Sequence, residues 1–264
     1  MSGDEILTSV TDRVLTITLN RPDARNALNR ALMYGLWDAV TAADTDADVD
    51  VVIITGSDPA FSAGVDLKEV SGAAPMSAPP RASGTGPERF PNGLYRFVPD
   101  ISKPIIGAVN GVCVTGGLEI ALQCTIIVAS EHARFGDTHA RVGIMPGGGL
   151  TVLLAQSVGW RTAVELSLTA RFITADDALR LGLVNHVVPH AELLPFAQGL
   201  AGEIVNNDQR AVRRLLQHYK AIGNAATLDE GHLIEGVMAE TWYAGLDNAG
   251  ANLDEVAARG RQQI

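Results

Sequence analysis

The segment from residue 104 to residue 129 limits the possible folds most, because it is long and apolar yet interrupted by glycine and polar residues. Two strand-like runs, Ile105–Val109 and Thr125–Ala129, flank a turn at Gly116-Gly117 and a short helical stretch. The glycines and polar residues within the segment argue against a helix that spans a membrane. The pattern therefore predicts a strand, turn, helix and strand in the core of an α/β fold.

Strand and helix patterns alternate in the N-terminal part as well. Residues Val14–Leu19 alternate in polarity, which is typical of a strand with one buried face. Apolar residues recur at helical spacing from Asn29 to about Ala43, and Val51–Ile54 is a continuous apolar run expected of a strand covered on both faces. These elements predict a mixed α/β fold that begins with a sheet.

The pattern changes in the last quarter of the chain. From about His190 onward helical spacing dominates, so we expect an α/β domain over residues 1–198 and a helical region over residues 199–264. Residues 72–91 are rich in Pro, Gly, Ser and Ala without periodicity, which predicts a long loop that covers or borders a site.

Composition and charge exclude several classes of function. The 264 residues carry a formal net charge of −10, whereas a nucleic-acid binder or a protein that adheres to anionic membranes needs clustered basic residues. Cys113 and Cys124 lie in apolar sequence, which favours buried free thiols over a disulfide or a metal site. We therefore expect a cytoplasmic protein without a metal site.

Glu119 is the one carboxylate between Lys103 and Glu131, and it follows the Gly116-Gly117 turn. Burying an unpaired carboxylate costs on the order of several kcal/mol or raises its pKa, whereas the first turn of a helix favours the anion by roughly 0.3–1 kcal/mol. Such opposing effects are typical of a general base. The alternative is that Glu119 caps its own helix and faces solvent.

A second glycine-containing turn follows the covered strand, within residues 60–68. This turn and the one at Gly116 can each direct a backbone N–H, one near Val65 and one at Gly116, toward a single oxygen. The pair predicts a pocket for developing negative charge. Either turn taken alone is equally compatible with an ordinary tight turn.

Several short motifs in a fixed order resemble one family. They are Asn20-Arg21-Pro22, Asn26-Ala27-Leu28, Phe61-Ser62-Ala63-Gly64-Val65-Asp66-Leu67, Lys103-Pro104, Ala108-Val109-Asn110-Gly111, Gly116-Gly117-Leu118-Glu119, Phe135-Gly136 and Gly143-Ile144-Met145-Pro146-Gly147. Over residues 10–195 this set resembles the crotonase superfamily, the enoyl-CoA hydratases and isomerases. The resemblance implies a spiral of ββα units and a C-terminal helical region that forms trimers, often paired into hexamers.

The resemblance also implies the site residues. The N–H groups of Val65 and Gly116 would form an oxyanion hole for the thioester carbonyl oxygen, and Glu119 matches one of the two catalytic glutamates of the hydratases. Coenzyme A, as part of the substrate, would meet six residues in or next to the N-terminal motifs: Arg25, Ala63, Gly64, Asp66, Leu67 and Lys68. Of these, Arg25 and Lys68 match positions that meet its phosphates, although each is also compatible with an ordinary solvated charge.

The chain departs from the family at the second glutamate, where it has His139. A histidine can position water or relay a proton, so hydration remains possible, although the substitution can also slow or redirect the reaction. The alternative role for His139 is a hydrogen bond to nearby backbone. A Ser62 hydrolase with His139 as base is a distant alternative, because the nucleophile-elbow pattern lacks its first glycine.

The sequence thus predicts an enoyl-CoA hydratase that acts on trans-2-enoyl-CoA thioesters with Glu119 as base, assisted by His139. Three alternatives stay open: an enoyl-CoA isomerase, which needs only one proton-shuttling group, another crotonase-type reaction, and an acyl-CoA-binding protein with weak catalysis. We expect a homo-oligomer and no cofactor other than the coenzyme A of the substrate. Acyl chain length and stereochemistry are expected to depend on residues 72–100 and on neighbours from another subunit. Residues 246–263, which depart from the pattern of many hydratases, bear on the far wall of the pocket.

Overall fold

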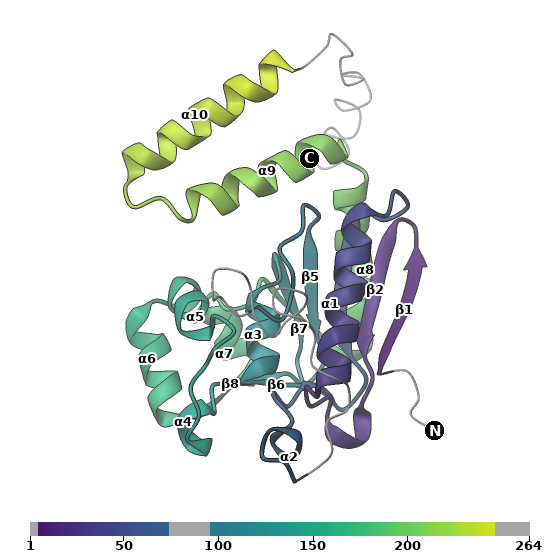
Figure 1. Cartoon of the computed structure of the whole chain (residues 1–264), viewed down its shortest axis with the longest axis vertical. Helices are drawn as coiled ribbons and strands as arrows, with labels where there is room; N and C mark the ends of the chain where they lie inside the picture. Colours follow the sequence, from purple (N-terminus) through teal and green to yellow (C-terminus); the bar gives the residue numbers. More distant parts are fainter. Residues whose placement is uncertain (1–4, 74–95, 246–264) are drawn as a thin grey trace. The chain divides into compact units, whose positions relative to one another are not determined.

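The computed structural model describes residues 5–73 and 96–245, and it is an α/β protein with two sheets (Figure 1). The chain divides into two units, Met1–Val205 and Asn206–Ile264. Residues 74–91 of the predicted loop, and the C-terminal residues 246–263, lie outside the described residues.

The first sheet has six strands in the order β1-β2-β3-β5-β7-β10. Their bounds are Ile6–Thr11, Val14–Leu19, Val51–Gly56, Ile105–Val109, Ile126–Ser130 and His186–Val188. The hairpin of β1 and β2 is antiparallel, and every other pair in this sheet is parallel. The strands predicted over Val14–Leu19, Val51–Ile54 and Ile105–Val109 are therefore confirmed.

The second sheet is made of three-residue strands in the order β4-β6-β8-β9. Their bounds are Ala60–Ser62, Val112–Val114, Arg134–Gly136 and Phe172–Thr174. Each of β3, β5 and β7 passes directly into a strand of the second sheet and then into a helix. Those helices are α2 (Leu67–Val70), α3 (Gly116–Leu122) and α4 (His139–Val142). The predicted succession of ββα units is thereby confirmed.

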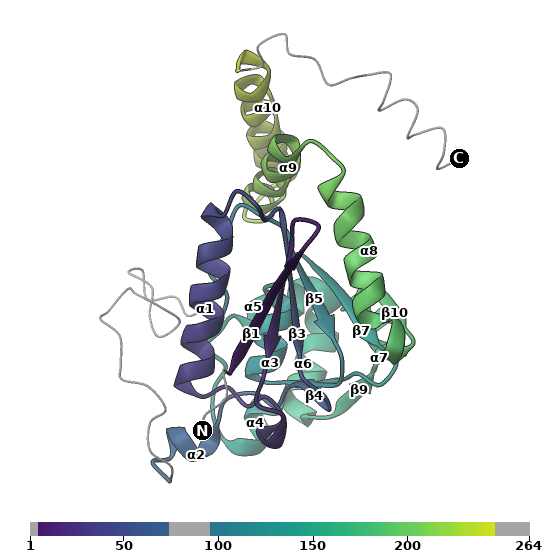
Figure 2. The ribbon, with the colours of Figure 1, turned by 90° about the vertical axis from the view of Figure 1, so that its right-hand side faces the viewer.

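Helices α1 (Arg30–Thr45) and α8 (Leu193–Val205) cover opposite faces of the first sheet (Figure 2). Both faces of β3 are apolar, because successive side chains of a strand point to opposite faces of the sheet. Val52 and Ile54 belong to the core on the α1 side, whereas Val51 and Ile53 belong to the core on the α8 side. A central parallel strand buried on both faces needs such a continuous apolar run.

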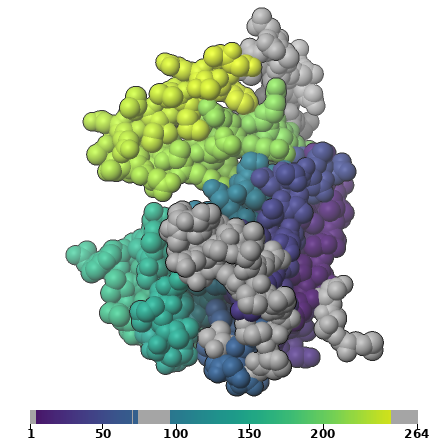
Figure 3. Space-filling model, viewed as in Figure 1, coloured from purple at the N-terminus to yellow at the C-terminus, as the bar shows by residue number. Residues whose placement is uncertain are grey.

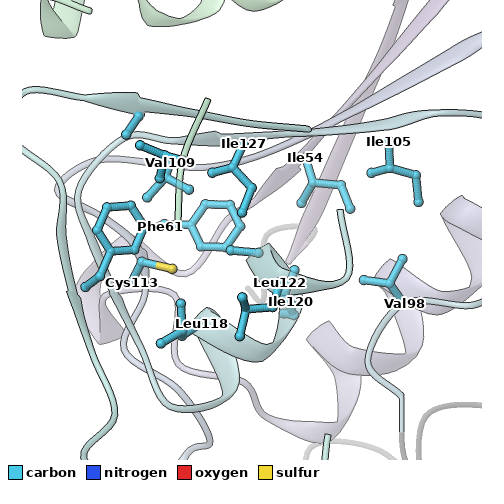
Figure 4. Close-up of a cluster of buried hydrophobic side chains, with 14 of the residues drawn as sticks. Ile54, Phe61, Val98, Ile105, Val109, Cys113, Leu118, Ile120, Leu122 and Ile127 are labelled. Carbon is cyan, nitrogen blue, oxygen red and sulfur yellow. The ribbon is translucent and has the colours of Figure 1, made fainter. Parts of the chain in front are cut away.

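The α1-side core extends beneath α3, whose seven residues are all buried. Figure 4 shows Leu118, Ile120 and Leu122 of α3 among apolar side chains from the strands of both sheets. Packing on several sides fixes the helix axis and therefore the direction of its one carboxylate, Glu119.

The remaining helices of the first unit are η1 (Pro22–Ala24), α5 (Leu150–Val158), α6 (Trp160–Thr169), α7 (Ala175–Arg180) and η2 (His190–Glu192). The outer sides of α5 and α6 form part of the protein surface (Figure 3). No helix in the described part of the chain has both the length and the hydropathy needed to cross a bilayer.

The second unit contains α9 (Gln209–Ile222) and α10 (Leu228–Ala244), which contact each other. Between them the guanidinium of Arg214 donates a hydrogen bond to the carbonyl of Met238 at 2.9 Å. The expected division after residue 198 falls inside α8, whereas the chain divides after Val205. The reason is that Ala201, in the second half of α8, belongs to the core against the sheet.

Asn26 connects the segment after η1 to the turn between β3 and β4. Its side-chain amide donates to the carbonyls of Ser57 at 2.7 Å and Ala60 at 2.6 Å, and its side-chain oxygen accepts from the N–H of Arg21 at 2.8 Å. The side chain is fully buried, so water cannot replace these partners. Asn26 thus fixes the start of the chain that runs from β4 to α2.

We predict that Asn26→Asp lowers the free energy of unfolding by about 3 kcal/mol or more, because it places a buried carboxylate oxygen against two carbonyl oxygens. Chemical denaturation checks this. Asn224→Asp, at an exposed asparagine whose amide bonds the Lys220 carbonyl, is the control and should change the value by about 0.5 kcal/mol or less. Equal effects of the two changes would contradict the assigned role of Asn26.

Candidate active site

The turn after β4 and the turn before α3 touch through their glycines. A Cβ on Gly64, whose φ is +84°, would lie 1.7 Å from Thr115 Oγ1, and a Cβ on Gly117 would lie 2.5 Å from the carbonyl oxygen of Ser62. No side chain larger than hydrogen fits at these contacts. The two glycine-containing turns found in the sequence are therefore brought together in space.

The amides of Val65 and Gly116 lie beside each other at this contact. A Cβ on Gly116 would be only 3.4 Å from the Val65 nitrogen. Over residues 5–73 and 96–245, neither N–H has a hydrogen-bond acceptor in the protein. Thr115 precedes Gly116 with a φ of +48°, an unfavourable backbone conformation for a β-branched residue. Two adjacent donors without a protein acceptor, one from each turn, can hold an oxygen that gains negative charge.

Glu119 lies in the first turns of α3 and is buried, with 1% of its surface exposed. Its Oε1 accepts a hydrogen bond from the N–H of Gly148 at 2.6 Å. Burial raises the pKa of this carboxyl, although the backbone N–H groups of Gly148 and Leu150 and the nearby His139 act in the opposite direction. The alternative of a solvent-facing helix cap is therefore wrong.

The segment at Gly148, which hydrogen-bonds Glu119, is itself held by Gln123, a residue that the sequence pattern did not indicate. The Gln123 amide donates to the carbonyl of Gly148 at 2.8 Å, and its oxygen accepts from the N–H of Val98 at 3.0 Å. A Cβ on Gly148 would lie 2.9 Å from Glu119 Cδ and 2.4 Å from Phe97, so this position also needs glycine. The glycines near residue 148 were visible in the sequence, but their contact with Glu119 was not.

His139 lies close enough to Glu119 for a positive charge on its ring to lower the pKa of that carboxyl. Its Nδ1 lies 2.6 Å from Oδ1 of Asp137, and its backbone N–H donates to the same oxygen at 3.1 Å. Burial by itself would raise the pKa of Asp137, but the hydrogen bonds from His139 and Ser167 bring it below the usual value. The His139 ring thus bonds a carboxylate rather than backbone, and Asp137 is a second residue that sequence reasoning missed.

The six residues expected to meet coenzyme A lie on two segments, Arg25 on one and residues 63–68 on the other. The carbonyl of Arg25 accepts from the N–H of Ala63 at 2.9 Å, which places the two segments side by side. The side chains of Arg25, Leu67 and Lys68 are exposed, whereas Gly64 is buried at the contact of the two turns.

Asp66 has structural partners of its own. Its carboxylate bonds the guanidinium of Arg21 at 3.1 Å and accepts from the N–H of Lys68 at 3.1 Å, so it caps α2. This carboxylate therefore holds the turn in place whether or not a ligand is bound.

Comparison with known proteins assigns the family. The family model described as enoyl-CoA hydratase/isomerase matches residues 9–244 of the 264. The chain belongs to the enoyl-CoA hydratase/isomerase family. The resemblance seen in the motifs and the crotonase-type fold are both confirmed.

Relatives within the enoyl-CoA hydratase/isomerase family cover most of the chain. It is 40% identical over 235 residues to the probable peroxisomal enoyl-CoA hydratase 1 of Arabidopsis thaliana, which covers 88% of this chain and 84% of that protein. It is 39% identical over 214 residues to a crotonyl-CoA hydratase of Syntrophomonas wolfei, with 81% and 80% covered. The crystal structure of an enoyl-CoA hydratase from Mycobacterium tuberculosis H37Rv superposes with a TM-score of 0.74 at 47% identity, covering 90% of this chain and 98% of that one.

We predict that Glu119→Gln stabilises the protein by an amount that grows with pH. The folded-state pKa of Glu119 lies above the ordinary value of 4.5, so the folded state binds this proton more tightly than the unfolded state does. Ionisation therefore lowers stability as pH rises from about 4.5 to the folded-state pKa, and glutamine removes this loss. Denaturation from pH 4 to pH 8 should show curves that coincide at low pH and separate above it; a gap independent of pH would contradict the assignment.

Proposed function

We propose that this protein is an enoyl-CoA hydratase that adds water to trans-2-enoyl-CoA thioesters. The observation that carries the proposal is the contact of two turns, where the amides of Val65 and Gly116 have no acceptor within the described residues and Gly116 begins the helix of the buried Glu119. Together they supply a place for a thioester oxygen and an acid–base group beside it. The relatives named as enoyl-CoA and crotonyl-CoA hydratases support the same reaction.

The proposed chemistry follows from these groups. The thioester carbonyl oxygen accepts hydrogen bonds from Val65 and Gly116, which stabilise the enolate charge that develops when water attacks Cβ. Glu119 takes one proton from the water, the oxygen bonds Cβ, and the enolate receives a proton at Cα from His139. The reaction balances with water and thioester alone, so we propose no metal and no redox cofactor.

We assign coenzyme A recognition to the exposed stretch described above, with Arg25 and Lys68 meeting its phosphates and Ala63, Gly64, Asp66 and Leu67 lying along the rest. In a chain with net charge −10, an anionic ligand needs such local cations. We further propose a cytoplasmic protein that acts as a trimer or a dimer of trimers. Exposed apolar side chains on the helices of the second unit, among them Leu215, Tyr219, Leu233 and Val237, support assembly.

Isomerisation of the double bond is the second candidate. It is favoured by His139 at the position of the second glutamate, because moving a double bond requires one group that shuttles a proton between carbons. The same preparation distinguishes the two reactions: hydration of crotonyl-CoA gives a 3-hydroxyacyl thioester, whereas isomerisation converts 3-enoyl to 2-enoyl thioesters without adding water. Acyl-CoA binding without either reaction would favour the binding-protein alternative.

We predict that the purified protein consumes the conjugated thioester absorbance of crotonyl-CoA, and that Glu119→Gln lowers kcat by at least about 10²-fold, since a positioned acid–base group contributes that much. Glu240→Gln, at an exposed glutamate of α10, is the matched control and should retain kcat. Full activity of Glu119→Gln would refute the role of this carboxylate.

We predict that the double change Arg25→Ala and Lys68→Ala raises KM for crotonyl-CoA about tenfold, equivalent to about 1.4 kcal/mol, with little change in kcat, because these side chains contact only the phosphates. The truncated substrate crotonyl-pantetheine, which lacks the nucleotide, should react equally well with both proteins. Arg180→Ala, at an exposed arginine paired with Asp177, is the control. An unchanged KM for crotonyl-CoA would place the phosphates elsewhere.

A further inference from the structure

The Asp137 carboxylate determines which nitrogen of His139 is open to a substrate. Its Oδ1 lies 2.6 Å from His139 Nδ1 and accepts the His139 backbone N–H at 3.1 Å. A third hydrogen bond comes from the hydroxyl of Ser167 on α6. One buried carboxylate therefore holds both the backbone and the ring of His139.

The hydrogen-bond pattern assigns the tautomer. Asp137 receives three donors, and an ionised carboxylate can only accept, so the hydrogen between it and the ring belongs to Nδ1. In the neutral ring Nε2 is then an unprotonated acceptor. Within the described parts of the chain, Nε2 has no hydrogen-bond partner.

The surroundings of the ring support this assignment. Glu119 on α3 is close enough for a charge on His139 to influence its pKa, while the guanidinium of Arg141, on the same short helix as His139, donates to the carbonyl of Ala170. Of the two carboxyl groups, Asp137 bonds Nδ1 directly. This arrangement leaves Nε2 as the nitrogen that can exchange protons with a bound molecule.

We propose that Asp137 is a positioning residue that fixes His139 in the Nδ1–H form, so that the Asp137–His139 pair replaces the second catalytic carboxylate and transfers protons only through Nε2. This inference rests on the proposed function. The reacting form of the ring carries a proton on each nitrogen; in the hydration step its Nε2–H bond breaks and that proton goes to Cα, while Glu119 receives the proton of the attacking water, so that the ring ends neutral with its proton on Nδ1. The electron pair stays on Nε2, the ring keeps its Nδ1 proton, and the proton on Glu119 returns to Nε2 through exchange with water.

The experiment compares the wild-type protein with Asp137→Leu, which is similar in size but offers no acceptor to Nδ1. The ring proton should then move to Nε2, leaving a tautomer that cannot take a proton back at that atom. Solid-state NMR of protein labelled with ¹⁵N in its six histidines reads the tautomer, and His139→Gln identifies the signal. We expect protonated Nδ1 in the wild type and protonated Nε2 in the variant.

The kinetic result expected for Asp137→Leu is a loss of about 10²-fold in kcat with KM within about twofold, because substrate binding does not involve Asp137. Asp50→Leu is the matched control, since Asp50 is equally buried but pairs with Arg13 at the start of β3. It should lower stability without lowering kcat. A tautomer that is the same in wild type and Asp137→Leu, or a kcat close to that of Asp50→Leu, would overturn the proposal.

A variant that does not fold and a wild type without activity are two further outcomes, and each is interpreted on its own. If Asp137→Leu does not fold, the wild-type spectrum still tests the proposal, because a neutral ring protonated at Nε2 would overturn it. If the wild type turns over no enoyl thioester, the proposed function fails, whereas the NMR comparison still reports whether Asp137 sets the tautomer of His139.

Discussion

The close approach of two backbone turns is the constraint on which the rest of the site depends. Gly64 and Gly117 allow the turn after β4 to contact the turn before α3 without intervening side chains. Because both turns come from equivalent places in successive ββα units, the two parallel pairs β3–β5 and β4–β6 bring them to the same level. The adjacent amides of Val65 and Gly116 are a direct result of this backbone geometry.

Burial has opposite consequences for the two carboxylates of the site. Glu119 receives backbone hydrogen bonds but, among residues 5–73 and 96–245, no cation bonds it directly, so burial dominates and raises its pKa. Asp137 is also buried, yet it binds the ring and backbone of His139 and the hydroxyl of Ser167, and these bonds lower its pKa. Such a separation of properties suits one carboxylate to proton transfer and the other to holding a partner in place.

The supporting residues show how a small set of hydrogen bonds positions this chemistry. Asn26 fixes the chain before the first turn, and Gln123 holds the Gly148 loop that bonds Glu119. None of these side chains needs to touch a substrate, yet each determines where a reacting group lies. The fold therefore supplies position, and the exposed stretch around Arg25 and Lys68 supplies the positive charge proposed for the ligand.

The sequence by itself determined the long strands, the α1 helix and the position of Glu119, because apolar periodicity and glycine turns are local signals. It also determined the family, since the motifs stand in order along one chain. The exposed β1 strand and the three-residue strands of the second sheet carry too few residues for such a pattern. Only the tertiary structure decided that Glu119 is buried against Gly148 and that Asp137 holds His139, because hydrogen bonds and burial depend on groups that folding, not sequence spacing, brings into contact.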